Sequence, residues 1–269
     1  VAQVSLSLVL VFIGGLFTRA LQEASTTEAG FDARGVEVAS IDTSSGADGG
    51  SARLSVAREI LERVRSIPGV TSASMATMLP LANESMGVGL TLPGAVSSSG
   101  TPDQIPGNGN IVAPGYFSTM QIPIVAGRDF SDRDVAGAPL VAIVGEAAAR
   151  RFWPREDPIG KRLIVNGGSS PGAVIQIIGV VRDIRYRAVD FGTVPFVYLP
   201  LSQHEPANLT LLVRSGNGRS VANSVRAAVA GQRTSPQAIA VESLDDVDAV
   251  ALTPQRVGAF VAGSLGFVG

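Results

Sequence analysis

The sequence predicts a mixed α+β fold, in which two β-α-β halves are separated by a strand-rich insert and flanked by transmembrane helices. Three features of the chain indicate this fold. Strand-like and helix-like apolar patterns follow one another in two separate stretches, 35–81 and 208–244. The middle, 111–200, is dense in apolar runs of strand length. Uncharged runs occupy both ends of the 269-residue chain.

The first uncharged run covers residues 1–18, and Arg19 is the first charged residue. As a helix this run would rise about 27 Å, which is close to the hydrocarbon thickness of a bilayer. A signal peptide would begin with Met and a basic region, whereas this chain begins with Val1. We therefore expect a transmembrane helix over 1–21 whose start is cut off.

The second uncharged run, 257–269, follows Arg256 and stops at Gly269. It is too short to cross a bilayer and is expected to be the beginning of a second span, with a helix from residue 244 leading into it over 244–269. Gly258, Ala262 and Gly266 recur every four positions, which suits close helix packing in lipid. The chain is thus expected to be a fragment, an extramembrane segment between two truncated spans.

The first β-α-β half begins with a strand over 35–41. A helix over 52–67 follows, with Ser51 as its N-cap and its apolar residues on one face. Pro68-Gly69 ends the helix, and 70–81 predicts the second strand.

The middle of the chain begins with 82–110, which is rich in Gly, Ser and Pro and is expected to be a linker or mobile loop. Apolar runs then predict strands at 139–144, 161–165, 174–181 and 196–201. Residues 145–152 predict a short helix that Pro154 ends.

The second β-α-β half starts with an alternating strand over 208–215. Val221, Val225 and Val229 then line one face of a helix that Gly231 terminates, and 237–244 gives the closing strand. Ser243 to Asp246 resembles a capping box that starts the next helix. The order and lengths match the first half, which predicts a duplicated unit.

Composition excludes several function classes. The chain has no cysteine, so disulfides, thiolate metal sites and cysteine nucleophiles are excluded. A net charge of −2 provides no basic field for nucleic acid. The only lysine, Lys161, lies in a stretch without the first Gly and the Ser/Thr of a phosphate-binding loop, so the chain does not bind ATP by that route.

Candidate metal and catalytic groups are equally sparse. His204 is the only histidine and is expected to be a solvated loop residue, because a zinc site or a catalytic triad needs partners that its surroundings lack. The acidic stretches 127–134 and 245–248 do not have the spacing of a calcium loop. The sequence therefore predicts no catalytic residue, cofactor or metal, and a membrane-anchored enzyme is disfavoured.

A cluster of acidic and basic residues occupies 148–163, AARRFWPREDPIGKRL. As an active site it would use Glu156 or Asp157 as the acid–base residue and Lys161 as a helper, but a polar turn leaves such groups hydrated. In the structural interpretation, which we favour, apolar anchors end a helix and the Pro/Gly residues fix the turn that follows. An exposed partner-binding patch is the alternative.

These residues also carry a family resemblance. Segments 113–134, 141–163 and 177–189 resemble, in this order, the extracytoplasmic domain of MacB/FtsX-type ABC-transporter permeases, and 64–81 and 194–203 match the same pattern. The candidate structural or partner-contact residues within the resemblance are Tyr116, Phe117, Gly127, Arg128, Phe152, Trp153, Pro154, Pro158 and Gly160.

The resemblance implies a porter-like subdomain in two halves, 22–92 and 195–243, split by an inserted sabre-like subdomain, 93–194. It places residues of about 22–250 outside a bacterial inner membrane. It implies a non-catalytic permease part that transmits ATPase-driven motion to the export of a substrate. The alternative is an FtsX-like signalling scaffold that controls an extracytoplasmic partner such as a cell-wall hydrolase.

The partners implied are a cytoplasmic ABC ATPase on another domain or subunit, a second permease copy or half, membrane lipid, and a periplasmic adaptor or hydrolase. No nucleic acid and no cofactor are expected.

Overall fold

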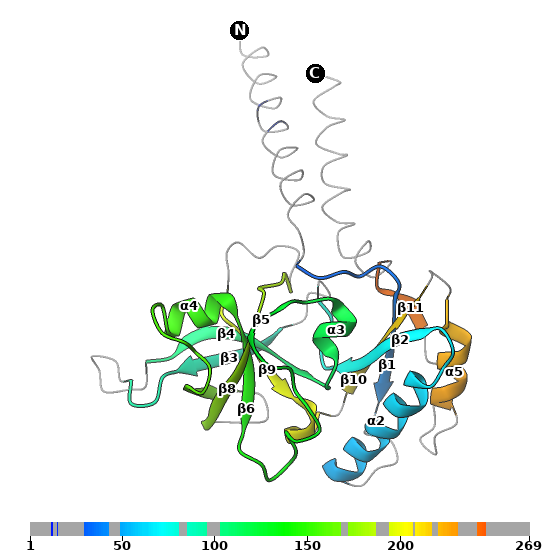
Figure 1. The fold of residues 1–269 in the computed structure, drawn as a ribbon, viewed down its shortest axis with the longest axis horizontal. Coiled ribbons are helices and arrows are strands. Elements are labelled where there is room, and N and C mark those ends of the chain that lie inside the picture. Colours follow the sequence, from blue (N-terminus) through cyan, green and yellow to red (C-terminus); the bar gives the residue numbers. More distant parts are fainter. Residues whose placement is uncertain are drawn as a thin grey trace, which may run out of the picture.

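The computed structural model describes residues 30–42, 49–80, 85–95, 103–167, 172–186, 194–206, 208–216, 220–230 and 241–245, together with Phe12 and Gly15. The described strands form one 11-stranded sheet (Figure 1). They are β1 (Val36–Asp42), β2 (Val70–Ala76), β3 (Met86–Thr91), β4 (Ile105–Val112), β5 (Ile124–Gly127), β6 (Val141–Gly145), β7 (Arg162–Asn166), β8 (Ala173–Val181), β9 (Phe196–Pro200), β10 (Asn208–Ser215) and β11 (Val241–Ser243). The helices are α2 (Gly50–Arg65), α3 (Tyr116–Met120), α4 (Glu146–Phe152) and α5 (Ala222–Ala230), with a 3₁₀ turn η1 (Leu201–Gln203).

One part of the sheet has the strand order β11-β1-β10-β2, and all of its pairs are antiparallel. The units β1-α2-β2 and β10-α5-β11 interlock, since β10 lies between β1 and β2, and β1 lies between β10 and β11. Both helices pack against the same hydrophobic core, α2 through Ile60 and Val64 and α5 through Val225 and Val229. We call this the four-stranded part.

Helix α2 begins two residues earlier than the sequence predicts. Its N-cap is Gly49, at a φ of 105°, and it forms no side-chain cap hydrogen bond, so the prediction that Ser51 caps the helix is wrong. Gly50 already belongs to the helix and is buried. The side chain of Glu205 lies so close to it that a Cβ atom on Gly50 would be 1.5 Å from a carboxylate oxygen. The side chain of Glu205 thus packs directly against the first turn of the helix.

The middle of the chain forms a closed ring of six strands in the order β4-β3-β7-β8-β6-β9, because β9 pairs back onto β4. Alternate residues of the ring strands are buried in one core, as period-two alternation requires. They include Val88, Leu90, Leu163, Val165, Ile175, Ile177, Val144, Val197 and Leu199. Strand β5 pairs with β8 outside the ring, and α4 packs against β6, β8 and β9.

The expectation of a linker over 82–110 is wrong, because this stretch contributes β3 and β4. Its glycines allow close packing of strands. A Cβ atom at Gly107 would lie 2.8 Å from Leu90 Cδ1, and one at Gly109 would lie 2.6 Å from Met86 Cε. Glycine in a strand often marks such a close approach. The glycines that this packing requires gave the stretch a composition like that of a loop.

The ring and the four-stranded part meet where Ala76 of β2 pairs with Val112 of β4. Ala113 donates its backbone N–H to Met75 O at 2.8 Å, and Thr77 donates to Ile111 O at 3.0 Å. The core under α2 and α5 and the core of the ring form one continuous cluster of buried residues. Strands β3 and β9, which the sequence boundaries placed in the outer halves, pair with strands of the middle.

A second hydrophobic cluster covers other residues of the same strands and is built around α3. Figure 1 shows α3 between the ring and the four-stranded part, on the side where residues 30–35 lead into β1. We call residues 30–35 the lead-in segment. The sheet therefore has α2 and α5 against one core cluster and α3 in the other.

The predicted transmembrane helices, 1–21 and 244–269, fall almost entirely outside the described residues, as do Gly231 and the end of the predicted capping box. Within the described part of the chain, no helix combines the length and the apolar character that a membrane span requires.

Candidate functional site

The corner at 148–163 places its two aromatic residues inside the protein. Phe152 ends α4 and Trp153 is its C-cap; each is 8% exposed, and their ring centroids lie 5.8 Å apart in the main core. Pro154 is exposed and Pro158 half-buried. Gly160 has a φ of 82° and donates its N–H to Ile177 O at 2.8 Å, which joins the turn to β8.

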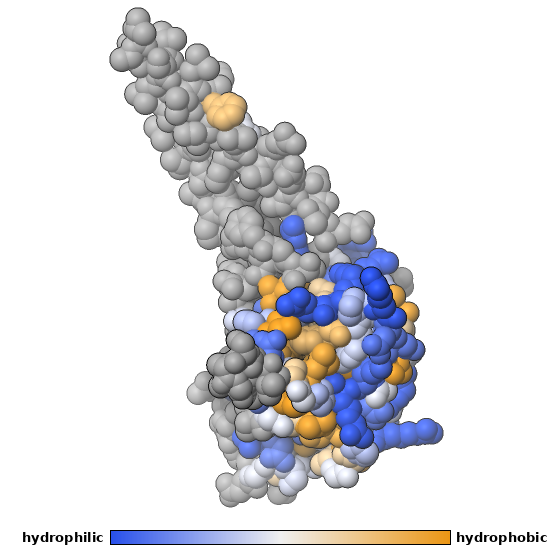
Figure 2. Space-filling model, turned by 90° about the vertical axis from the view of Figure 1, so that its left-hand side faces the viewer, coloured by the Kyte–Doolittle hydropathy of each residue, from blue (hydrophilic) through white to orange (hydrophobic). Residues whose placement is uncertain are grey.

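The charges of this corner lie on the surface, and those of the turn after α4 pair with one another. Lys161 forms an ion pair with Glu156, and Asp157 accepts a 2.9 Å hydrogen bond from the backbone N–H of Ile159. The chain thus uses these groups to shape a solvated turn, without a shared cavity that would alter their chemistry. Figure 2 shows the side of the molecule that carries α4 and β3, with apolar residues over its middle beside a band of hydrophilic ones.

A partner of α4 that the sequence did not single out is Asp183. It accepts hydrogen bonds from Ala147 N at the start of the helix and from Arg150, each at 3.0 Å. A Cβ atom at Gly145 would lie 2.5 Å from its Oδ1, so the glycine leaves room for this carboxylate.

The segment with Tyr116, Phe117, Gly127 and Arg128 is a structural unit. Tyr116 and Phe117 are buried on α3. Gly127 has a φ of 76°, and a Cβ atom there would lie 2.2 Å from Ile178 O, so a larger residue would separate β5 from β8. Arg128 donates two 2.8 Å hydrogen bonds to Asp134.

The carboxylates of this segment are already engaged. The hydrogen bond from Arg128 holds the pKa of Asp134 below its usual value, and the backbone and hydroxyl of Ser131 also donate to this carboxylate. Burial raises the pKa of Asp129, which accepts from Phe130 N at 2.7 Å. In the residues that the structure describes, no group of three or more His, Cys, Asp or Glu side chains could hold a metal ion.

His204 is buried, which contradicts the expectation of a solvated loop residue. Only 3% of it is exposed, and its Nδ1 lies 3.0 Å from Pro200 O. Burial lowers the pKa of the imidazole, so the neutral form is favoured. The contact partner, Pro200, is the last residue of β9, four positions earlier in the chain, and the polar local sequence did not indicate this burial.

A fully buried amide, that of Asn110 on β4, forms four hydrogen bonds. Its Oδ1 accepts from Thr77 Oγ1 at 2.9 Å and from Met78 N at 3.2 Å. Its Nδ2 donates to Met78 O at 3.0 Å and to Tyr186 Oη at 2.9 Å. The amide therefore ties the chain after β2 to the chain after β8.

Three tyrosines extend this network. The hydroxyls of Tyr116 and Tyr186 lie 2.9 Å apart. Tyr186 stacks on Phe196 with ring centroids 4.1 Å apart, and Phe117 meets Tyr198 edge-on at 4.9 Å. Burial raises the pKa of Tyr116, Tyr186 and Tyr198 well above that of a free phenol, so all three stay neutral.

Arg214, at the end of β10, connects the lead-in segment to α3. Its Nε donates to Thr119 O and its Nη1 to Arg34 O, each at 2.7 Å, and its Nη2 donates to Asp32 O. It is 9% exposed, and burial lowers the pKa of the guanidinium. Asp32 N also donates to Met120 O at 3.0 Å.

These contacts define a junction, consisting of Thr77, Asn110, Tyr116, Tyr186 and Arg214. Helix α3 is bonded to the ring through Tyr116 and to the lead-in segment and β10 through its carboxyl end. Sequence reasoning identified only Tyr116 among these residues. Its side chains are held by hydrogen bonds to one another or, for Arg214, to backbone carbonyls, so the junction connects the parts of the fold rigidly.

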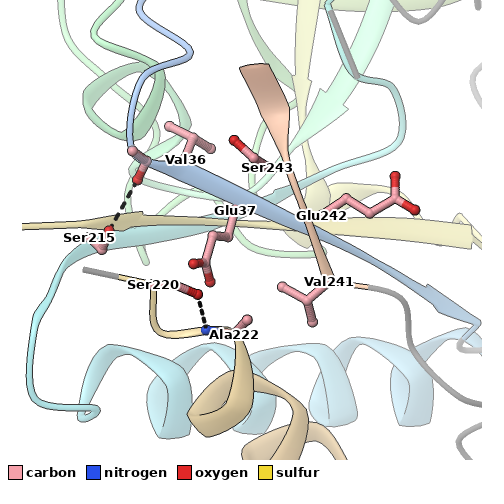
Figure 3. Close-up of a pocket in the computed structure, with 9 residues that line it drawn as sticks. Val36, Glu37, Ser215, Ser220, Ala222, Val241, Glu242 and Ser243 are labelled. Atoms are coloured by element: carbon pink, nitrogen blue, oxygen red, sulfur yellow. Dashed lines mark hydrogen bonds between the residues drawn. The ribbon is translucent and has the colours of Figure 1, made fainter. Parts of the chain in front are cut away.

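Among the described residues, cavities also lie outside the junction. One, of about 390 Å³, separates α2 from residues 131–135 and η1 and is bordered by Arg58, Glu62 and Asp132. Another, of about 320 Å³, lies among β1, β11 and the start of α5 (Figure 3). There Glu37 points toward α5 and accepts from Val221 N at 3.0 Å, so it caps that helix.

Comparison with known proteins identifies the family. Residues 4–254 match the model of the MacB-like periplasmic core domain. The periplasmic region of MacB from Actinobacillus actinomycetemcomitans has a similar fold, with a TM-score of 0.52 and 16% identity over 85% of this chain and 97% of that one. The extracellular domain of the ABC-type transporter YknZ from Gram-positive bacteria gives a TM-score of 0.50 and 13% identity over 77% of this chain and 99% of that one.

A macrolide export ATP-binding/permease protein MacB of Marinobacter nauticus is 39% identical over 63 residues. That stretch is 23% of this chain and only 9% of the relative, so the chain matches a small portion of it. The family match, in contrast, covers nearly the whole sequence. The chain therefore belongs to the MacB-like periplasmic core domain family.

Proposed function

We propose that this domain transmits motion between the membrane part of an ABC permease and the space outside the membrane. In this proposal it acts as a rigid lever and catalyses no reaction. The observation that carries the proposal is the clamp of Arg214 on the carbonyls of Asp32, Arg34 and Thr119. Through it, the first described residues after the expected span are bonded both to the central strand β10 and to α3.

The arrangement of the terminal strands supports the same conclusion. Strand β1 follows the expected first span and β11 precedes the expected second one, and these two strands pair directly. A rotation of either span would reach the sheet through adjacent strands. The four-stranded part and the ring share one continuous core of buried residues. Because packed interiors transmit strain, the ring is not expected to slide against the four-stranded part.

We infer that the four-stranded part is the porter-like subdomain and the ring the sabre-like insert. The ATPase that drives the motion would be a cytoplasmic domain or subunit, as in MacB-type permeases. A second permease copy or half and a periplasmic adaptor are the further partners that this function requires. Export is the proposed outcome, with the nature of the cargo left to experiment.

The proposal is tested by measuring whether the domain moves as one body. Ser40 of β1 and Arg155 of the corner are both exposed, and this chain has no cysteine of its own. Spin labels on Ser40→Cys and Arg155→Cys in the full permease with its ATPase should give one narrow distance, unchanged between nucleotide-free and ATP-trapped states. Two distances that exchange with nucleotide would overturn the proposal.

The role of the clamp is tested with Arg214→Met in the same labelled protein. Loss of the guanidinium leaves three carbonyls without their donor, so the distance distribution should broaden while ATP hydrolysis continues. Arg151→Met, at an exposed arginine of α4, is the matched control and should leave the distribution narrow. An unchanged distribution in the Arg214 variant would mean that the clamp does not connect span and sheet.

A further inference from the structure

Strand β5 is an exposed apolar feature that the proposed function does not use. All four of its residues are exposed, with Ile124 at 38% and Val125 at 54%. Within the described residues it pairs on one edge only, with β8, and its register is interrupted between Ile124 and Ala126. Its neighbour Pro123 is also exposed.

The start of β5 lies at the same edge of the domain as the lead-in segment. Pro123 O accepts from Arg182 N at 3.0 Å, and the residues after Arg182 reach Gly30, where a Cβ atom would lie 2.7 Å from Asp183 O. Figure 1 shows β5 on the side where the lead-in segment enters. Only a short stretch of sequence separates Gly30 from the uncharged run 1–18.

The charges at this edge suit a lipid headgroup layer. Arg182 is exposed beside Pro123. The nearby carboxylates of Asp32 and Asp183 are paired with Arg34 and Arg150, so their repulsion of lipid phosphates is weakened. An apolar strip next to a free-standing arginine is the pattern of a segment that lies in a membrane interface.

We propose that Pro123, Ile124, Val125 and Arg182 form a lip that rests on the outer surface of the bilayer. Ile124 and Val125 enter the boundary between headgroups and acyl chains, and Arg182 binds lipid phosphate. The inference rests on the membrane setting of the proposed function, but not on the rigid transmission of motion. Two apolar side chains bind a bilayer weakly, yet the tether to a span provides a high effective concentration, so weak contact suffices.

The lip gives the lever a second point of contact with the membrane, away from the spans. A domain held at both places has a defined tilt in its resting state. Motion driven by the spans then has to lift the lip from the lipid surface.

The test uses the full permease in lipid nanodiscs with single cysteines at Val125 and Val174. Val174 is 49% exposed and lies at the other end of β8, about 23 Å along the strand from Val181, which faces Ile124 across the pair. Because both sites are exposed valines, the two variants should have the same melting temperature. Each is labelled with a bimane fluorophore and exposed to lipids that carry a nitroxide near the headgroup.

We expect quenching at Val125→Cys to exceed that at Val174→Cys at least threefold. In nanodiscs that contain phosphatidylglycerol, adding Arg182→Gln should reduce the quenching at residue 125 about twofold, with little change in pure phosphatidylcholine. Equal quenching at both sites would overturn the proposal. The proposal would also be overturned if neither the lipid nitroxide nor aqueous iodide quenched the fluorophore at residue 125, because a protein partner would then cover β5. Neither of these two outcomes would change the spin-label distances that test the proposed lever, so the two proposals can fail separately.

Discussion

The corner at 148–163 and the junction around α3 distribute their polar groups in opposite ways. At the corner, charged side chains are dense in the sequence, lie in solvent and pair with near neighbours, as Lys161 does with Glu156. At the junction, single polar residues far apart in the sequence meet in the interior, as Asn110 does with Thr77 and Tyr186. A dense charge cluster therefore marks a solvated turn here, whereas isolated polar residues connect the parts of the fold.

The largest effect is expected at the corner, from its apolar residues. Trp153→Ala removes a buried ring and should lower the free energy of unfolding by about 4 kcal/mol. Lys161→Met at the same corner removes an exposed ion pair and should change it by less than about 0.5 kcal/mol. Denaturant titration of residues 22–250 measures both. If the Lys161 variant were as unstable as the Trp153 variant, the exposed charges of the corner would matter as much as its buried aromatic residues, contrary to the contrast drawn here.

At the junction a polar residue should matter nearly as much. Asn110→Ala removes four hydrogen bonds and leaves the backbone of Met78 and the hydroxyl of Tyr186 without their partner. We expect the free energy of unfolding to fall by about 3 kcal/mol. Asn223→Ala, at an exposed position of α5, is the matched control and should cost less than about 0.5 kcal/mol. If the two asparagine variants melt alike, the buried network does not hold the two parts together.

The pair of Arg128 and Asp134 is intermediate, since the arginine is half exposed and the carboxylate buried. Asp134→Asn should cost about 1.5 kcal/mol at pH 7. Arg128 holds the folded-state pKa of Asp134 below the unfolded value, so this stabilisation is present above about pH 4 and is lost as the pH falls through the folded pKa.

The pH dependence gives this prediction its control. The stability difference between wild type and Asp134→Asn should narrow below about pH 4. Asp129 titrates in both proteins and largely cancels from the difference. A difference that stays constant down to pH 2 would mean that the charge of Asp134 contributes nothing.

Much of the fold could be predicted because local patterns decide it. The strand over 208–215 matches β10 residue for residue, and the helix over 145–152 differs from α4 by one residue. The mixed α+β class follows from such elements. The predictions failed where a tertiary contact overrode the local signal, as at Gly107 and Gly109 of β4, and where a residue in a polar stretch is buried, as at His204.

The junction was not predictable for the same reason. Asn110 lies in a Gly/Asn-rich stretch typical of loops, and Arg214 reads as the charged end of a strand. Each acquires its partners only when segments far apart in the chain meet, Arg214 with Asp32 and Asn110 with Tyr186.

The interlocked strand order also constrains how the protein is made. Strand β1 is among the first parts of the domain to leave the ribosome, yet both of its neighbours, β10 and β11, are among the last. Its two edges stay unpaired while the whole ring is synthesised, and contacts between such distant segments form slowly. Until β11 arrives, the nascent chain carries an apolar strand with open edges, a hazard for aggregation. We therefore expect biogenesis, rather than the finished fold, to be the stage at which this domain depends most on chaperones.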